Sequence, residues 1–77
     1  MIELLELLSR RLVDDPSAVR VEELDDEDGT RVLRLHVAPD DRGKVIGRQG
    51  RTVRALRTLA RASAGRSGRR VRLEIAE

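Results

Sequence analysis

The spacing of apolar residues along the chain predicts a succession of helices and strands. Apolar residues that recur every three or four positions are typical of one face of a helix, whereas strict alternation is typical of a half-buried strand. Both patterns occur more than once in the sequence. The predicted elements are helix 2–13, strand 18–24, strand 31–37, helix 39–46, helix 51–64 and strand 70–76.

The same patterns predict which side chains face the core. In strand 31–37, alternation separates an inner set (Leu33, Leu35 and Val37) from an outer set (Val32, Arg34 and His36). In helix 51–64 the predicted inner face consists of Val53, Leu56, Leu59, Ala60 and Ser63. Gly65 follows as a suitable residue to end that helix.

The order of the predicted elements, α-β-β-α-α-β, indicates one α+β domain that spans residues 1–77. The acidic turn at residues 25–30 contains Gly29 and joins the first two strands as a hairpin. A sheet with one apolar face must be covered, and three helices are available to cover it. We therefore expect a two-layer fold in which three helices cover one face of a three-stranded mixed sheet.

The residue types that are missing exclude several classes of protein. The chain has no cysteine, which excludes disulfide frameworks, thiolate metal sites and thiol catalysis. It has no aromatic residue, which excludes modules that stack bases on aromatic platforms. His36 is the only histidine and lacks the partners of a metal site or catalytic pair. We expect no enzyme and no cofactor, and the absence of a membrane span or signal-peptide pattern leads us to expect a cytoplasmic protein.

The charge is divided unevenly along the chain, although the net charge is only +2. Residues 1–41 contain 5 arginines and 12 carboxylates, for a net charge of −7. Residues 42–77 contain 10 arginines, 1 lysine and 2 carboxylates, for a net charge of +9. An acidic half followed by a strongly basic half suggests a region that binds a polyanion, and nucleic acid is the first candidate.

The basic half contains a glycine-flanked turn between two predicted helices, with the sequence Lys44-Val45-Ile46-Gly47-Arg48-Gln49-Gly50. Glycine at both ends lets the chain turn tightly and lets a ligand backbone approach without meeting a Cβ atom. Arg48 adds a cation, and the free N–H groups at the start of the next helix point out of the turn. These features favour phosphate binding. The turn lacks the Gly-Lys-Ser/Thr ending of a nucleotide P-loop and the third glycine of a dinucleotide fingerprint.

Arginines also form a stripe along the helix that follows this turn. Arg51, Arg54, Arg57 and Arg61 are spaced by three, three and four residues and share one face. Arg51 and Arg54 are nearest to the turn, so we expect them to contact phosphates. Arg57 and Arg61 lie further along the helix. They either contact further phosphates or only expose a charged face of the helix to solvent. Each phosphate that such a residue neutralises makes binding more sensitive to salt.

In its setting between two helices and after an alternating strand, the turn resembles the GXXG loop of the KH domain, which clamps about four nucleotides of single-stranded RNA or DNA. Further segments are similar to the small stand-alone bacterial KH proteins of the KhpA (YlqC) family. These segments are the leucine-rich first helix, the turn Asp14-Asp15-Pro16, residues 37–50 and residues 69–75. The resemblance covers essentially the whole chain and implies the prokaryotic, type II KH arrangement.

The resemblance also implies a function and a site. A member of this family would be a cytoplasmic RNA-binding protein that self-associates and pairs with a larger KH-containing protein, KhpB. It would act in post-transcriptional control linked to cell envelope growth and division. Gly47 and Gly50 match the glycines of the family motif. The expected RNA-binding residues are Lys44, Val45, Ile46, Gly47, Arg48, Gln49, Gly50, Arg51 and Arg54.

One acidic segment counts against a simple basic groove. We expect Asp25-Asp26-Glu27-Asp28, between the first two strands, to form the variable loop at the groove edge. Four carboxylates there would repel phosphate. The sequence leaves open whether this loop narrows binding, points away or meets a basic partner.

Two other functions fit part of the pattern. Leu4 and Leu7 are candidates for a surface that holds a protein partner, which would make the chain an interaction subunit with secondary RNA binding. Alternatively, residues 51–64 would be the recognition helix of a helix-turn-helix DNA binder. The strands on both sides and the G-x-x-G turn argue against that third interpretation.

Overall fold

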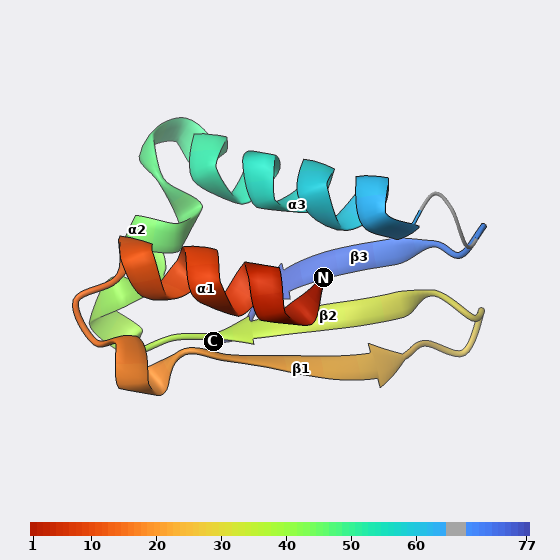
Figure 1. The fold of residues 1–77 in the computed structure, drawn as a ribbon, viewed down its shortest axis with the longest axis horizontal. Helices are drawn as coiled ribbons and strands as arrows, with labels where there is room; N and C mark the ends of the chain where they lie inside the picture. The colour runs from red at the N-terminus through yellow and green to blue at the C-terminus, as the bar shows by residue number, and fades with distance from the viewer. Residues whose placement is uncertain (65–67) are drawn as a thin grey trace.

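The structure of the protein is a computed structural model that describes residues 1–64 and 68–77, and Figure 1 shows the arrangement of its elements. The helices are α1 (Ile2–Leu12), α2 (Arg42–Ile46) and α3 (Arg51–Ala64), and the strands are β1 (Arg20–Asp25), β2 (Arg31–His36) and β3 (Val71–Ile75). Short 3-10 helices precede β1, α2 and α3: η1 (Pro16–Ala18), η2 (Pro39–Asp41) and η3 (Arg48–Gly50).

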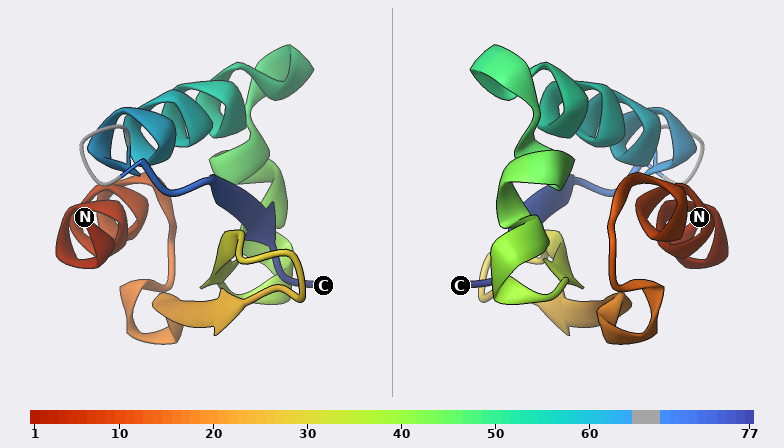
Figure 2. Two further views of the ribbon diagram at one scale, coloured as in Figure 1. Left: turned by 90° about the vertical axis from the view of Figure 1, so that its right-hand side faces the viewer. Right: turned by 90° about the vertical axis from the view of Figure 1, so that its left-hand side faces the viewer.

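The strands form one mixed sheet in the order β1-β2-β3. β1 and β2 are antiparallel, with Val21 opposite Leu35, whereas β2 and β3 are parallel, with Leu33 opposite Leu73. α1 and α3 lie side by side on one side of the sheet, with α2 between α3 and the strands at one end (Figures 1 and 2). This arrangement confirms the predicted α+β class, the element order and the mixed sheet.

The core lies where the sheet meets the helices. Its buried members are Leu5, Val19, Leu33, Leu35, Val45, Leu56, Ala60 and Leu73. Leu5 of α1, Leu35 of β2 and Val45 of α2 are almost completely inaccessible to solvent. Burying an aliphatic side chain of this size contributes about 1.5–3 kcal/mol. The burial of Val45 fixes the short helix α2 in this core, and α2 in turn fixes the start of the glycine turn that follows it.

Several element boundaries differ from the prediction by one or two residues. The first strand begins at Arg20 rather than residue 18, because Pro16–Ala18 form a 3-10 helix. The Val19 N–H donates to the Pro16 carbonyl at the end of this helix. The first helix ends at Leu12, since Val13 is already extended. The second strand ends at His36, and the last strand covers residues 71–75 rather than 70–76. The helix end predicted at Gly65 lies outside the described residues.

The inner face of α3 is narrower than predicted. Its buried residues are Val53, Leu56, Ala60 and Ala64, whereas Leu59 is 38% exposed and Ser63 is also exposed. The prediction was wrong for these two positions because successive residues are rotated by about 100° around a helix. Leu59 therefore points well away from the line that Leu56 and Ala60 present to the core. α3 consequently has a large apolar side chain on its solvent side.

The face of the sheet opposite the helices carries charges that are paired across strands. Arg34 of β2 lies between Glu22 and Glu74, at 3.8 and 3.4 Å, and His36 Nε2 is 2.9 Å from Glu22 Oε1. The hydrogen bond with His36 lowers the pKa of Glu22 despite the opposing effect of desolvation. Val32 belongs to this outer set, as predicted, but it is only 4% exposed.

Candidate nucleic-acid interface

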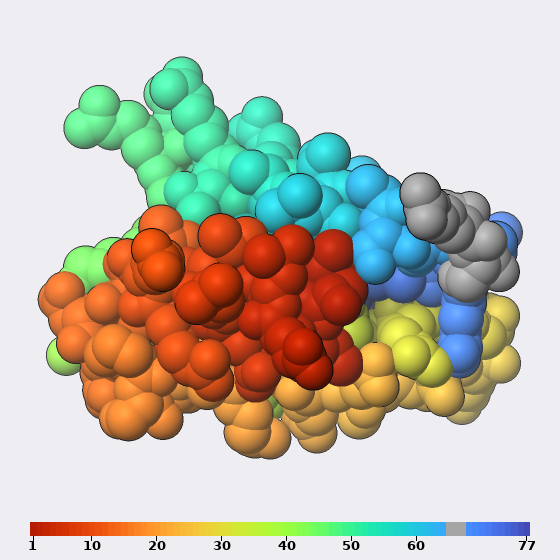
Figure 3. All heavy atoms as spheres, in the orientation of Figure 1, coloured from red at the N-terminus to blue at the C-terminus, as the bar shows by residue number. Residues whose placement is uncertain are grey.

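The glycine turn is a compact structure between α2 and α3. The Gly47 N–H donates to the Gly43 carbonyl at 2.8 Å, and the Gly50 N–H donates to the Gly47 carbonyl at 3.1 Å. Gly47, Gln49 and Gly50 all have positive φ values, of 77°, 57° and 73°. In Figure 3 the side chains of this segment project clear of the rest of the molecule at the upper left, where a long polymer has free access to them.

The two glycines of the turn meet different surroundings. A Cβ atom on Gly47 would lie 2.2 Å from Thr52 Oγ1, so the side chain of Thr52 packs directly against this glycine. A Cβ atom on Gly50 would meet only Arg54 Nη2, at 3.8 Å. Gly47 is therefore needed for packing inside the turn, whereas the surface at Gly50 is open to an approaching ligand backbone.

A buried carboxylate anchors the start of α2, the helix that leads into the glycine turn. Asp41, whose side chain is 3% exposed, accepts hydrogen bonds from the backbone N–H groups of Asp14 and Asp15 at 3.2 and 3.0 Å. Desolvation would raise the pKa of Asp41, but these two bonds and Lys44 outweigh it, so the pKa is lowered. Asp41 thus ties the segment after α1 to the start of α2.

Lys44 and Val45, both predicted to bind RNA, are engaged within the protein. The Lys44 ammonium pairs with Asp14 and also lies 3.3 Å from Asp41, and its hydrogen bond to Asp14 is the main reason that its pKa is raised. Val45 has no exposed surface. Both side chains therefore support α2, and only Ile46, at 40% exposure, offers the solvent an apolar side chain from this end of the helix.

The arginines next to the turn contact neutral groups of the turn itself. Arg51 Nη2 donates to Gln49 Oε1 at 3.1 Å, and Arg54 Nη2 donates to the Gln49 backbone carbonyl at 2.7 Å. Arg48 is exposed and has no ion pair in the described part of the chain. The turn and the start of α3 therefore keep their full positive charge.

Ion pairing separates the arginines of this structure into two groups. Arginines on the sheet and near the hairpin are paired with carboxylates: Arg31 with Glu23, Arg34 with Glu74, Arg69 with Asp25 and Arg72 with Asp26. Among the described residues, the arginines without an ion pair are Arg10, Arg11, Arg20, Arg42, Arg48, Arg51, Arg54, Arg57, Arg61 and Arg70. Half of this second group lies on the turn and α3.

The acidic loop, residues 25–28, lies far from the glycine turn. The loop lies at the end of the β1–β2 hairpin, at the opposite end of the molecule from the glycine turn (Figure 1). Asp25 pairs with Arg69 at 2.7 Å, and Asp26 lies 3.5 Å from Arg72. Hydrogen bonds from Thr30 hold the pKa of Asp28 below its ordinary value. The loop therefore points away from the turn, and its basic partners lie within the same chain.

A shallow hollow adjoins the outer edge of β3. It has a volume of about 520 Å³ and is lined by residues of β2, α3 and the C-terminal segment. Arg57 reaches across from α3, and its Nε donates to the Leu73 carbonyl at 3.4 Å. Arg57 therefore links α3 to the edge of β3 at this hollow.

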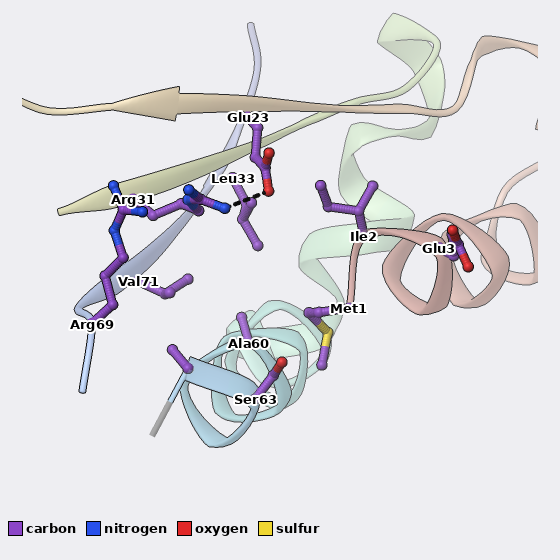
Figure 4. A pocket seen from close by; sticks show the side chains of 11 residues that line it. Met1, Ile2, Glu3, Glu23, Arg31, Leu33, Ala60, Ser63, Arg69 and Val71 are labelled. Atoms are coloured by element: carbon purple, nitrogen blue, oxygen red, sulfur yellow. Dashed lines mark hydrogen bonds and ion pairs between the residues drawn. The ribbon is translucent and has the colours of Figure 1, made fainter. Parts of the chain in front are cut away.

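A second hollow, of about 540 Å³, lies at the other end of the helices (Figure 4). Met1, Ile2 of α1, Ala60 and Ser63 of α3 and Leu33 of β2 are among the residues that surround it. Its arginines are already paired, Arg31 with Glu23 and Arg69 with Asp25. Both arginine side chains that line this hollow are therefore already neutralised.

Residues 1–64 and 68–77 were also compared with the requirements of a metal site and of a membrane-spanning helix. These residues contain no group of three or more histidines and carboxylates placed to hold a metal ion. Of the helices described, none has both the length and the apolar composition that crossing a membrane requires.

Comparison with known proteins identifies the family. The family described as "KhpA/KhpB, KH domain" matches residues 2–75. The chain belongs to this family. The predicted resemblance to the KhpA family is thereby confirmed, and the mixed sheet with its helices on one side is the type II KH fold.

Curated relatives of similar length carry the name "RNA-binding protein KhpA". The KhpA of Halalkalibacterium halodurans is 51% identical over 75 residues, which cover 97% of each chain. The KhpA of Clostridium acetobutylicum is 47% identical over 75 residues, which cover 97% of this chain and 99% of the relative. The KhpA of Mycobacterium tuberculosis is 46% identical over 77 residues, which cover 100% of this chain and 91% of the relative.

Solved structures of Era share the fold. Era of Aquifex aeolicus aligns with 96% of this chain at a TM-score of 0.57 and 19% identity. Era in complex with MgGDPNP and nucleotides 1506–1542 of 16S ribosomal RNA aligns at a TM-score of 0.58 and 19% identity. The chain spans 28% of the length of each Era chain. At this identity the likeness shows the fold alone.

Proposed function

We propose that the protein binds single-stranded RNA through the glycine turn and the adjoining surface of α3 and β3. The observation that carries the proposal is the contrast in ion pairing. Carboxylates neutralise Arg31, Arg34, Arg69 and Arg72 of the sheet and its surroundings. In the described part of the chain, Arg48, Arg51 and Arg54 at the turn have no acidic partner. The relatives named RNA-binding protein KhpA support the choice of RNA as the polyanion.

The geometry suggests how the strand is held. The RNA backbone approaches the turn at Gly50, which has no side chain of its own, and Arg48 neutralises a phosphate. Bases then lie along the surface between α2, α3 and the edge of β3. Since the chain has no aromatic residue, the bases are held by the exposed aliphatic side chain of Ile46 and by hydrogen bonds rather than by stacking. No step in this account requires catalysis or a cofactor.

Crosslinking of bound RNA tests the site. The double variant Arg48→Asp and Gln49→Asp places two carboxylates on exposed positions of the turn. We expect it to fold, as judged by circular dichroism and thermal melting, and to lose RNA crosslinking. Arg20→Asp, a charge reversal at an exposed position on β1, serves as the control and should retain crosslinking. Equal crosslinking by the folded turn variant and the parent would refute the site assignment.

A comparison of single strands with duplexes tests the third interpretation, a helix-turn-helix DNA binder. The proposed site accepts one strand at a time, so a single-stranded RNA should bind more tightly than duplex DNA of the same length. Equal affinity, or a preference for the duplex, would favour the DNA binder.

We further propose that the protein works in the cytoplasm with a second KH domain, either in a homodimer or with a KhpB-type protein. Binding of about four nucleotides by a single KH domain is weak, and a second linked domain raises avidity. The described helices leave Leu4, Leu7 and Leu59 exposed, and α1 and α3 adjoin on one face of the molecule (Figure 3). The task implied by the family resemblance is post-transcriptional control linked to cell envelope growth and division.

Light scattering and pull-down from a bacterial lysate test the partner proposal. We expect a dimer, and we expect Leu59→Asp to weaken it without unfolding the protein because Leu59 lies outside the core. A strict monomer that captures no KH protein would contradict the proposal. A stable complex with partners that persists after RNA binding is abolished would instead favour an interaction subunit.

A further inference from the structure

The glycine turn holds one residue in a conformation that its side chain disfavours. Gln49 has φ 57° and ψ 24°, and among the described residues it is the one position other than glycine with a positive φ. Left-handed backbone brings a Cβ atom too close to the following carbonyl oxygen. Neighbouring contacts must therefore keep Gln49 in place.

Two arginines from the first turns of α3 supply these contacts. Arg54 Nη2 donates to the backbone carbonyl of Gln49 at 2.7 Å. Arg51 Nη2 donates to its side-chain Oε1 at 3.1 Å. Arg54 is exposed, and charge patterning alone would make it a phosphate contact. In the structure its guanidinium is already engaged with the turn.

The hydrogen bond from Arg54 acts on a particular peptide plane. The Gln49 carbonyl and the Gly50 N–H belong to the same planar peptide unit, so fixing one fixes the direction of the other. The Gly50 N–H donates to the Gly47 carbonyl at 3.1 Å and closes the turn. Arg54 therefore holds one end of the peptide unit while Gly47 holds its other end.

We propose that Arg54 is a positioning residue that holds the glycine turn in its binding conformation before RNA arrives. This inference rests on the proposed RNA binding and deepens it. The cation that meets the phosphate is Arg48, which is exposed and free of ion pairs in the described chain. Arg54 acts through the Gln49 carbonyl and keeps that hydrogen bond in the complex.

Salt dependence separates a positioning residue from a phosphate contact. Arg54→Gln and Arg61→Gln remove the same charge from the same helix at points about 10 Å apart along its axis. We expect Arg54→Gln to weaken binding of a short single-stranded RNA about tenfold, in line with the loss of a charged hydrogen bond. The slope of log K against log salt concentration should stay at the parent value.

Two results of this titration would overturn the proposal. A phosphate contact at Arg54 would reduce the magnitude of the slope by about 0.7 in the Arg54→Gln variant. If Arg61→Gln weakens binding as much as Arg54→Gln does, the weaker binding comes from the loss of one positive charge on α3 and not from the contact with Gln49.

Nuclear magnetic resonance of the free protein tests the same contact without RNA. In Arg54→Gln we expect altered backbone φ at Gln49 and faster hydrogen exchange of the Gly50 N–H, while the free energy of global unfolding stays close to that of the parent. An unchanged turn would overturn the proposal. If the parent fails to bind RNA, the proposed function fails, and the resonance measurement still decides whether Arg54 holds the turn.

Discussion

Gly47 and Gly50 stand at the two ends of one turn, but their backbones require glycine for different reasons. Gly47, with φ 77° and ψ 171°, lies in a region that is essentially restricted to glycine, and its Cα packs against Thr52. Gly50 has φ 73°, and a Cβ there would meet only the end of the Arg54 side chain, at 3.8 Å. A sequence motif presents the two positions as equivalent, whereas the structure distinguishes a packing glycine from a ligand-facing one.

Alanine substitution at each glycine tests this difference. Gly47→Ala adds a steric overlap to the backbone cost, so the free energy of unfolding should fall by about 3 kcal/mol. Gly50→Ala carries the backbone cost alone, about 1–2 kcal/mol. Urea denaturation of both variants gives the comparison. Equal losses would show that Thr52 yields without cost and that the packing argument is wrong.

Residue-scale contacts mark the limit of what the sequence can predict. The glycine turn and the arginines beside it follow from spacing along the chain. The engagement of Lys44 does not, because its partner Asp14 is 30 residues away and is brought near only by the fold. The link between Arg54 and Gln49 also escapes a charge pattern, since its acceptor is a backbone carbonyl.

Among the elements, α3 connects the core to the proposed RNA surface. Its buried stripe follows spacings of three and four residues through Val53, Leu56, Ala60 and Ala64. Periodicity predicted the helix and most of this stripe. It misplaced Leu59, because hydrophobic character alone does not distinguish a side chain that meets the core from one left on the surface.

Truncation of two leucines on α3 tests the observed orientation. Leu56 is 4% exposed, so Leu56→Ala should lower the free energy of unfolding by about 2–5 kcal/mol. Leu59 is largely outside the core, so Leu59→Ala should change the free energy of unfolding of the monomer by about 0.5 kcal/mol. Denaturation at low protein concentration keeps association from contributing. A larger loss for Leu59→Ala than for Leu56→Ala would mean that α3 is rotated from the position described.

The attachment of α2 depends on Asp41, and this gives stability a dependence on pH. The pKa of Asp41 is lowered in the fold, so its contribution is present above the unfolded pKa of about 3.9 and is lost as the pH falls through the folded pKa. We expect Asp41→Asn to lower Tm at pH 7 by on the order of 10 °C and to flatten the acid limb of the stability curve.

Asp40→Asn is the matched control for Asp41, since Asp40 is the exposed neighbour in the same turn. Its Tm at pH 7 should equal that of the parent. The acid limb of Asp41→Asn should not vanish completely, because Glu22 and Asp28 also have lowered pKa values. If Asp41→Asn has the same Tm as the parent both at pH 7 and in acid, the Asp41 contacts do not hold α2.

Across the whole molecule, folding converts a charge gradient along the sequence into a charge pattern on the surface. The acidic half of the chain supplies β1, β2 and their hairpin, and its carboxylates neutralise arginines of β2, of β3 and of the segment before β3. The glycine turn and the start of α3 lie at the opposite end of the molecule from that hairpin (Figure 1). The sequence predicted the two halves but not their pairing, because register between distant strands is a property of the sheet.

Chemical-shift mapping locates bound RNA on the surface of the protein. A short single-stranded RNA is titrated into the isotopically labelled protein while backbone amide resonances are recorded. We expect the largest shifts on residues 46–54, with smaller ones along the edge of β3. Largest shifts on the opposite face of the sheet, around Arg34 and Glu74, or at the hairpin near Asp26, would contradict it.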